Sequence, residues 1–391
     1  MSVKPNHIRS LYVHVPFCAQ KCEYCAFFSE ASSGELIHRY VAALIREMEL
    51  VAHDVVPGTI FFGGGTPSLL NLRQWEQILR TMERLNLLGA GEFTVECNPA
   101  TVSADKARLL RSFGVNRISM GVQSLDENLL DRLGRIHSRE MVFKSFDTLR
   151  AAGFDNVNID LMFAIPGQTM AIWRATLDEA LALGSEHLSS YEVIYEEDTP
   201  LFERMKAGEF DVDEDLACDL YEELIERSAT AGFQQYEIAN FARNENGQTE
   251  NKERGIPSRA SRHNVNYWRG GSFYALGPSA TGYVRGVRTK NWSNTQLYCE
   301  QLEKDRRAIE STEELPPLRR AGETAAFGLR MNAGWPFADF QATTGHDLRE
   351  GWADEMKKLS DQGWGKIEPD NFHLTRQGLR FADAAGEMFL R

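Results

Sequence analysis

Residues 11–25 read LYVHVPFCAQKCEYC, an apolar run followed at once by three cysteines. The apolar and β-branched residues of 11–15 predict a buried strand, so the cysteines at 18, 22 and 25 fall in the loop after it. In a long intracellular chain, clustered cysteines are more typical of a metal site than of disulfides. Three thiolates on a four-iron cluster leave one iron open to a further ligand. The spacing C-x3-C-x2-C therefore predicts a cluster with one open position.

Zinc, or three simply buried thiols, are the alternatives for this motif. A structural zinc ion usually takes four ligands, and His14 is the nearest histidine in sequence. Strand alternation could, however, turn His14 away from the loop. The ligand count favours an iron–sulfur cluster over zinc. Cys97, Cys218 and Cys299 are interpreted as small, buried apolar residues.

Six strand and helix units extend outward from this motif. A parallel sheet with helical crossovers follows from such an alternation, and ligands collect at the carboxyl ends of its strands. The sequence therefore predicts an α/β fold, a barrel or an open, partial (β/α)6 barrel resembling a TIM barrel. Strands are expected at 11–15, 59–62, 93–97, 117–122, 156–163 and 187–194, with helices at 35–53, 72–85, 103–114, 138–153 and 169–183.

The domain organisation is expected to have four parts. Residues 1–242 form the barrel, and the polar stretch 243–262 is an insertion loop. Residues 263–310 close the barrel and carry the pattern H-N-x-x-Y-W. Residues 311–391 form a small C-terminal α+β domain resembling a winged helix. Its expected elements are helices at 318–331 and 348–359, a hairpin at 363–375 and a final helix from 376.

Bulk composition excludes several classes of protein. The 391 residues carry a net charge of −13 without a basic stripe, which argues against nucleic-acid binding. There is no run of about 18 apolar residues that would span a membrane. The first residues lack the apolar segment of a secretory signal, so a cytoplasmic location is expected. Peripheral membrane association and a homodimer are left open.

Polar or glycine residues follow the expected strands where a ligand would lie. A glycine turn lets backbone N–H groups approach an anionic ligand, although many such turns are only tight bends. Polar groups at strand ends suit ligand contacts, and within a strand they equally suit satisfied core positions. The candidates are Gly64, Gly65 and Thr66 after the second strand, Glu96 at the end of the third, Gln123 at the end of the fourth and Asp160 in the fifth.

The segments YVHVPFC at 12–18 and KCEYC at 21–25 resemble the opening of radical S-adenosylmethionine (SAM) enzymes. More narrowly, the chain resembles the branch that contains oxygen-independent coproporphyrinogen III dehydrogenase and haem chaperones. This resemblance implies a [4Fe–4S] cluster on Cys18, Cys22 and Cys25, with SAM on the open iron. Arg135 would otherwise be an exposed charge at a helix end. The resemblance implies SAM contacts at Tyr12, Tyr24, Gly64, Gly65, Thr66, Glu96, Gln123, Arg135 and Asp160, and it assigns no catalytic residue.

Within this branch the sequence is closest to the haem chaperones. Phe27 stands where the dehydrogenase has a fourth cysteine, and only about ten residues precede Leu11, fewer than in that enzyme. The pattern H-N-x-x-Y-W resembles a haem-chaperone signature. His263 is the candidate haem ligand, and the adjacent aromatic pair could stack on a porphyrin or simply anchor the loop.

The expected function is therefore haem binding and transfer to an acceptor protein such as a respiratory enzyme, with the cluster and SAM as cofactors. The alternative is a radical SAM enzyme acting on a tetrapyrrole, so enzymatic activity stays open at this point.

Overall fold

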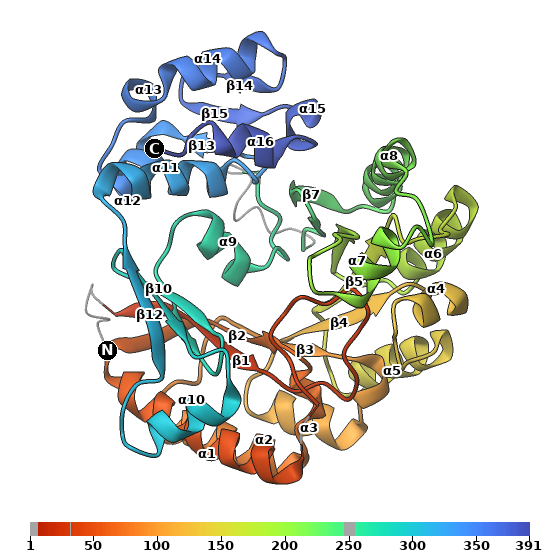
Figure 1. Cartoon of the computed structure of the whole chain (residues 1–391), viewed down its shortest axis with the longest axis vertical. Helices are drawn as coiled ribbons and strands as arrows, with labels where there is room; N and C mark the ends of the chain where they lie inside the picture. The colour runs from red at the N-terminus through yellow and green to blue at the C-terminus, as the bar shows by residue number, and fades with distance from the viewer. Residues whose placement is uncertain (1–6, 32, 246–254) are drawn as a thin grey trace. The chain divides into compact units, whose positions relative to one another are not determined.

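A computed structural model of the chain describes residues 7–31, 33–245 and 255–391. The chain divides into two compact units (Figure 1). The first unit contains Met1–Ala231, Phe273–Gly282 and Thr289–Thr312. The second contains Gly232–Ser272, Tyr283–Arg288 and Glu313–Arg391. Both units are therefore assembled from segments that are separated in sequence.

The first unit is built on a parallel sheet. Its strands are adjacent in the order β6-β5-β4-β3-β2-β1, and each neighbouring pair is parallel. On its other edge β1 pairs in parallel with β9 (Tyr274–Leu276). The prediction of an α/β fold with a six-stranded parallel sheet is confirmed. The six strands are β1 (Ile8–Val15), β2 (Val55–Gly64), β3 (Glu92–Cys97), β4 (Arg117–Gln123), β5 (Val157–Phe163) and β6 (His187–Glu192).

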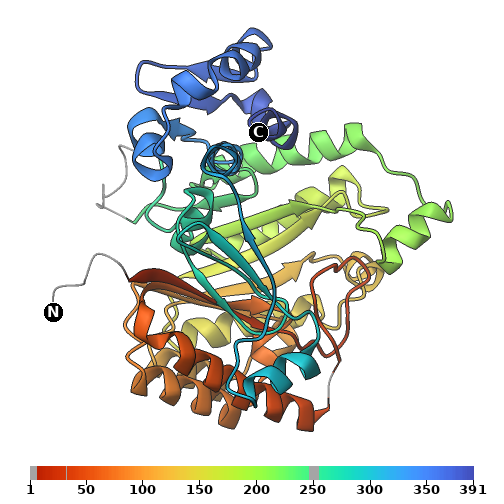
Figure 2. The same cartoon turned by 60° about the vertical axis from the view of Figure 1, so that its left-hand side comes forward.

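Helices connect these strands. Figures 1 and 2 show the first three helices along the outer face of the sheet. The side chains of Ser103 and Ser138 accept backbone N–H groups at two helix starts, as N-caps do. The helices are α1 (Gly34–Val51), α2 (Leu72–Arg84), α3 (Ala104–Ser112), α4 (Glu127–Arg132), α5 (Arg139–Ala151), α6 (Met170–Ala182), α7 (Pro200–Lys206) and α8 (Glu214–Thr230).

The two faces of the sheet differ in chemistry. Successive side chains of a strand point to opposite faces, so alternate residues share a face. Ile118 and Ile159 belong to the apolar core, whereas their neighbours Arg117, Ser119 and Asn158 are buried polar residues. The strands β4 to β6 therefore present a polar inner face, and the site is built on that face.

The second unit has its own apolar core and a small antiparallel sheet. The sheet order is β13-β15-β14, and the predicted hairpin is confirmed as its last two strands. The core includes Trp335, Phe340, Trp352 and Phe372. The elements are β13 (Trp335–Pro336), β14 (Gly365–Ile367), β15 (Asn371–Leu374), α11 (Pro317–Gly328), α12 (Phe337–Thr344), α13 (Leu348–Gly351), α14 (Ala353–Asp361), α15 (Arg376–Leu379) and α16 (Ala382–Glu387).

One predicted helix of this unit is interrupted. The expectation of a single helix over 348–359 is wrong, because the chain breaks at Trp352 between α13 and α14. The Trp352 backbone has φ −137° and ψ 30°, outside the helical region. Its indole is fully buried and donates a hydrogen bond to the Phe389 carbonyl at 2.9 Å. The interruption of the helix therefore coincides with the burial of this large side chain.

The remaining elements include the region predicted as an insertion. Residues 246–254 of that region lie outside the described residues. Its described flanks are joined by an ion pair between Arg259 and Glu245 at 2.8 Å. No helix in the described part of the chain is long and apolar enough to cross a membrane. The elements are the antiparallel pair β7 (Gln234–Glu237) and β8 (Asn240–Ala242), α9 (Arg262–Trp268), α10 (Thr295–Leu302) and a sheet of β10 (Thr281–Val284), β11 (Val287–Asn291) and β12 (Ile309–Glu314).

Candidate functional site

The three clustered cysteines lie on the loop that follows β1. The base of this loop is closed by backbone hydrogen bonds from Cys18 N–H to the Glu30 carbonyl, at 3.2 Å, and from Glu30 N–H to the Pro16 carbonyl, at 2.8 Å. Its middle is fastened where Glu23 N–H donates to the Leu133 carbonyl at 3.0 Å. These bonds fix a loop that has little regular structure of its own.

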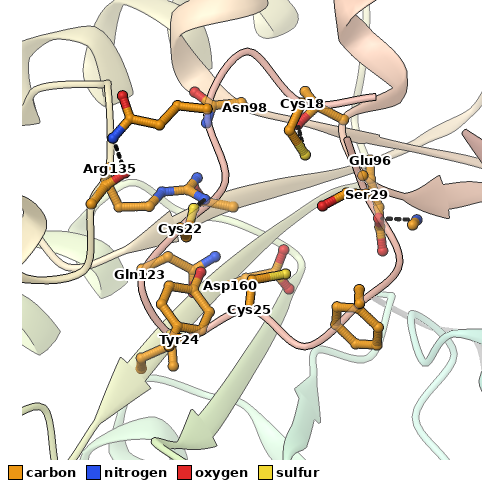
Figure 3. Close-up of a pocket in the computed structure, with 18 of the residues that line it drawn as sticks. Cys18, Cys22, Tyr24, Cys25, Ser29, Glu96, Asn98, Gln123, Arg135 and Asp160 are labelled. Carbon is orange, nitrogen blue, oxygen red and sulfur yellow. Dashed lines mark hydrogen bonds between the residues drawn. The ribbon is translucent and has the colours of Figure 1, made fainter. Parts of the chain in front are cut away.

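Cys18, Cys22 and Cys25 are free, half-buried thiols that line one cavity of about 470 Å³ (Figure 3). The Thr66 hydroxyl lies 3.5 Å from Cys18 Sγ, and Arg135 donates to Cys22 Sγ at 3.4 Å. In the described residues, no three His, Cys, Asp or Glu side chains are gathered to hold a single metal ion. Ligands to different irons of one cluster do not need to converge on a point.

The glycine turn at the end of β2 packs tightly against β1. Gly64 has φ 103°, a conformation that favours glycine. An added Cβ would lie 2.5 Å from the His14 ring at Gly64 and 2.8 Å from the Val15 carbonyl at Gly65. The turn can take this position only because it lacks side chains there.

The N–H groups of this turn are used within the protein. Gly65 N–H donates to the Val15 carbonyl and Thr66 N–H to the Phe17 carbonyl, both at 2.8 Å, and Gly64 N–H donates to the Glu96 carboxylate at 3.2 Å. The expected anion-binding turn with free N–H groups is therefore not what the structure has. Gly64, Gly65 and Thr66 do line the cavity, and their small size gives the loop and β1 room to meet.

Two carboxylates share the cavity wall (Figure 3). Burial, together with the neighbouring Asp160, raises the pKa of Glu96 to about 8. Burial also raises the pKa of Asp160 to about 6, against hydrogen bonds from Asn158 and Ser119 and the charge of Arg117, which lower it. Two carboxyl groups held in this way favour a cationic ligand, because a nearby positive charge stabilises their ionised forms.

Arg135 and Gln123 complete this side of the cavity. Arg135 is half-buried, and its second terminal nitrogen donates to the Gly121 carbonyl at 2.5 Å. This arginine is therefore a cavity residue and not an exposed helix-end charge. Gln123 has φ 67°, a strained backbone conformation of the kind that is often found at functional sites.

His14 faces the cysteine loop, which sequence alternation had left undecided. Its Nε2 lies 2.8 Å from the Phe28 carbonyl, which only accepts hydrogen bonds, so Nε2 carries the proton. Nδ1 then accepts from the Tyr12 hydroxyl at 3.1 Å. Burial lowers the pKa of His14, consistent with a neutral ring.

The predicted site residues divide into those that line the cavity and those that do not. Tyr12 does not line the cavity, and its hydroxyl is hydrogen-bonded to His14. His263 belongs to the second unit. The residues that the structure brings together are Cys18, Cys22, Tyr24, Cys25, Gly64, Gly65, Thr66, Glu96, Gln123, Arg135 and Asp160.

His263 lies on α9 and is only 1% exposed. Its Nε2 is 2.6 Å from the Tyr267 hydroxyl, and the two rings are arranged edge to face. The adjacent Trp268 ring lies under the guanidinium of Arg330, 5.0 Å from the ring centre. The H-N-x-x-Y-W segment is thus packed within the second unit.

An apolar rim was not identified from the sequence. Phe27, Ile136, Tyr191 and Ile194 line the cavity, and their exposed fractions are 71%, 42%, 43% and 66%. The rule that ligands lie at strand ends could have indicated Tyr191 and Ile194, since they lie at and just beyond the end of β6. Large exposed apolar side chains around one cavity mark a binding surface.

The comparisons with known proteins agree with this architecture. Residues 12–180 match the family model described as the Radical SAM superfamily, and residues 315–381 match the HemN C-terminal domain. The solved structure of coproporphyrinogen III oxidase (HemN) from Escherichia coli covers 99% of this chain and 91% of its own, with a TM-score of 0.83 and 21% identity. At that identity the likeness shows a shared fold. The fold and the cysteine loop thus define a radical SAM protein.

Relatives that match the whole chain show which family within the radical SAM superfamily it resembles. The chain is 33% identical to "Heme chaperone HemW" of Lactococcus lactis subsp. lactis (strain IL1403), over 100% of this chain and 98% of that protein. It is also 33% identical to "Heme chaperone HemW" of Escherichia coli (strain K12), over 97% and 98% respectively. The chain therefore belongs to the HemW family of the radical SAM superfamily, and membership of the superfamily implies a [4Fe–4S] cluster and SAM.

Proposed function

We propose that this protein binds haem and passes it to an acceptor protein, and that it holds a [4Fe–4S] cluster with SAM in the cavity of its first unit. The observation that carries the proposal is the 33% identity, over essentially the full length, to proteins named as haem chaperones. An acceptor such as a respiratory enzyme would be met in the cytoplasm or at a membrane surface.

Cys18, Cys22 and Cys25 would hold the cluster. All three thiols open on the cavity, and the loop that carries them is fastened at its base and in its middle. Arg135 lies beside Cys22 Sγ, where its positive charge would offset the negative charge of a thiolate-bound cluster. Phe27 follows on the same loop and points an exposed side chain at the cavity where the dehydrogenase resemblance would place a fourth cysteine.

SAM fits the remaining wall of the cavity. It carries a sulfonium and an amine. Glu96 and Asp160 are two carboxyl groups of raised pKa, and a cation would stabilise their ionised forms. Gln123 and Tyr24 supply further polar atoms nearby. When bound, the cluster and SAM supply one-electron chemistry, which belongs to the cofactors, and the protein supplies binding and orientation.

Haem ligation by His263 is the finer part of the proposal. Because His263 is buried and lies 2.6 Å from the Tyr267 hydroxyl, iron would have to replace this contact at Nε2 or bind after the side chain turns outward. The imidazole is a common haem ligand, and the two neighbouring aromatic side chains provide apolar surface for a porphyrin.

Haem titration under reducing conditions tests the proposal. We expect the full chain to bind haem with a defined stoichiometry, seen as a shifted Soret band. The His263→Ala variant should bind about 10-fold or more weakly, while the His346→Ala control, a half-buried histidine of the same unit, should bind like the wild type. Failure of the wild type to bind haem would exclude the chaperone function. Haem binding by His263→Ala with the wild-type affinity would exclude only His263 as the ligand.

A radical SAM enzyme acting on a tetrapyrrole is the second candidate. The observation that favours it is the apolar rim of Phe27, Ile136, Tyr191 and Ile194 around the cavity, where an apolar substrate would fit. The test is incubation of the loaded protein with reductant, SAM and coproporphyrinogen III. Substrate-dependent formation of 5′-deoxyadenosine and protoporphyrinogen would favour the enzyme, and their absence with cluster and SAM intact would favour the chaperone.

A further inference from the structure

The inner face of β4, β5 and β6 carries a closed hydrogen-bond network centred on Asn158. We infer that Asn158 is a positioning residue, which fixes the Asp160 carboxylate in the cavity wall and thereby sets the affinity for SAM without touching it. The inference rests on the proposed binding of SAM in this cavity. Asp160 lines the cavity, whereas Asn158 is 1% exposed and lies outside the lining.

Every hydrogen-bonding position of the Asn158 amide is used. Asn158 precedes Asp160 by two residues on β5, so both side chains are on the same face of the sheet. The amide nitrogen donates to Asp160 Oδ1 and to Ser119 Oγ, both at 2.7 Å. The amide oxygen lies 2.6 Å from His187 Nδ1 and accepts from the Ser189 hydroxyl at 3.1 Å. An amide has two donors and two acceptor lone pairs, and this one has no freedom to rotate.

The direction of the network is fixed by its end at a carboxylate. An ionised carboxylate only accepts hydrogen bonds, so the amide nitrogen must face Asp160 and the amide oxygen must face His187. His187 Nδ1 therefore carries the proton. The Ser119 hydroxyl accepts from Asn158 and donates to Asp160 Oδ2 at 3.1 Å, so each oxygen of Asp160 receives a donor. All of these groups thus support one orientation of the ionised Asp160.

The charges around this network support the same role. Arg117 is buried on β4, and its charge acts in favour of ionised Asp160, whereas burial acts against it. Burial and Arg117 lower the pKa of His187, so this ring is neutral and adds no second positive charge. The donors from Asn158 and Ser119, together with the Ser189 hydroxyl, which also hydrogen-bonds Asp160, are consequently the groups that decide where the Asp160 oxygens point.

A double-mutant cycle tests this inference on the anaerobically reconstituted full chain. SAM affinity is measured by calorimetry for the wild type, Asn158→Ala, Asp160→Ala and the double variant. Loss of a hydrogen bond to a charged group should weaken SAM binding of Asn158→Ala about 10- to 100-fold, with iron content unchanged. In the Asp160→Ala background the same change should cost less than about threefold, because Asn158 acts only through Asp160.

Thr59→Val is the matched control. Thr59 is buried on the inner face of β2 and donates to Ser10 Oγ at 2.9 Å, and the strands β3 and β4 separate β2 from the β5 strand of Asp160. It should bind SAM within about twofold of the wild type, as a substitution without a specific role does. If Asn158→Ala does not fold, Ser119→Ala decides, since it removes the hydroxyl that donates to Asp160 and accepts from Asn158, and it should weaken binding about 3- to 10-fold.

Two results would overturn the inference. One is wild-type affinity in both Asn158→Ala and Ser119→Ala, and the other is an equal loss from Asn158→Ala with and without Asp160. A wild-type chain that binds no SAM would overturn the proposed function together with this inference. The two failures are therefore distinguishable by the wild-type titration alone.

Discussion

At the scale of single residues, the carboxyl pair Glu96 and Asp160 determines what the cavity can bind. Glu96 is half-buried, and its pKa is raised to about 8 by burial and by Asp160. Without a ligand, Glu96 therefore carries a proton at neutral pH. A cation in the cavity favours the ionised form, so binding has to expel this proton.

We therefore expect SAM affinity to rise with pH between pH 6 and 7.5. The raised pKa belongs to the ligand-free protein, and the proton must leave on binding, so the gain is at most about tenfold per pH unit and ends as pH passes about 8. Calorimetry in two buffers of different ionisation heat measures both the affinity and the proton released. Glu96→Gln should bind more weakly and lose most of this pH dependence. Wild-type affinity that falls as pH rises over this range would contradict the assignment.

Residue patterns predicted part of this site. Glu96, Gln123 and Asp160 were recognisable because they end or lie in strands whose carboxyl ends meet at one edge. Arg135 was indicated only by the family resemblance, because its contact with Cys22 joins positions 113 residues apart. The orientation of His14 likewise depends on the Phe28 carbonyl, which the course of a long loop places.

At the scale of elements, the glycine turn after β2 controls how closely the cysteine loop can approach β1. Gly64 combines a positive φ of 103° with the His14 ring 2.5 Å from the position of an added Cβ. Gly89 also has a positive φ, 89°, but nothing lies within 4 Å of its Cβ position. Substitutions at these two glycines can therefore separate the effect of steric contact from the effect of backbone strain.

Gly64→Ala is expected to lower the free energy of unfolding by about 2–4 kcal/mol, since strain and overpacking add. Gly89→Ala should lower it by only about 1–2 kcal/mol, through strain alone. Urea unfolding midpoints of the ligand-free proteins measure this difference, and Gly64→Ala should in addition bind SAM weakly. Equal destabilisation by the two substitutions would show that the contact with His14 is unimportant.

Element boundaries show where local patterns stop being sufficient. The crossover helices were predicted from their caps and periodicity, and the structure confirms them to within a few residues. Helix α8 (Glu214–Thr230), which comes after β6 and α7, was not among the predicted helices. The break at Trp352 was also missed, because it depends on a hydrogen bond to Phe389, 37 residues later.

At the scale of the whole molecule, the regular alternation of strands and helices predicted the fold class because sequential β/α units can close only as a parallel sheet with crossovers. Each of the two units, however, contains segments that are separated in the sequence. Phe273–Gly282 returns to the first unit, and within it β9 pairs with β1. Such pairing depends on contacts between residues more than 250 positions apart, which no local pattern reports.

The central claim is that the loop after β1 holds an iron–sulfur cluster, and metal analysis after anaerobic reconstitution tests it most directly. We expect about four irons and four sulfides per wild-type chain, and a full cluster in the control Cys218→Ala, whose cysteine is exposed on α8 and not buried as the sequence suggested. Cys22→Ala should hold no stable cluster yet keep the wild-type circular dichroism, because Cys22 lies on a loop outside the apolar core. Zinc without sulfide in the wild-type chain would contradict the account.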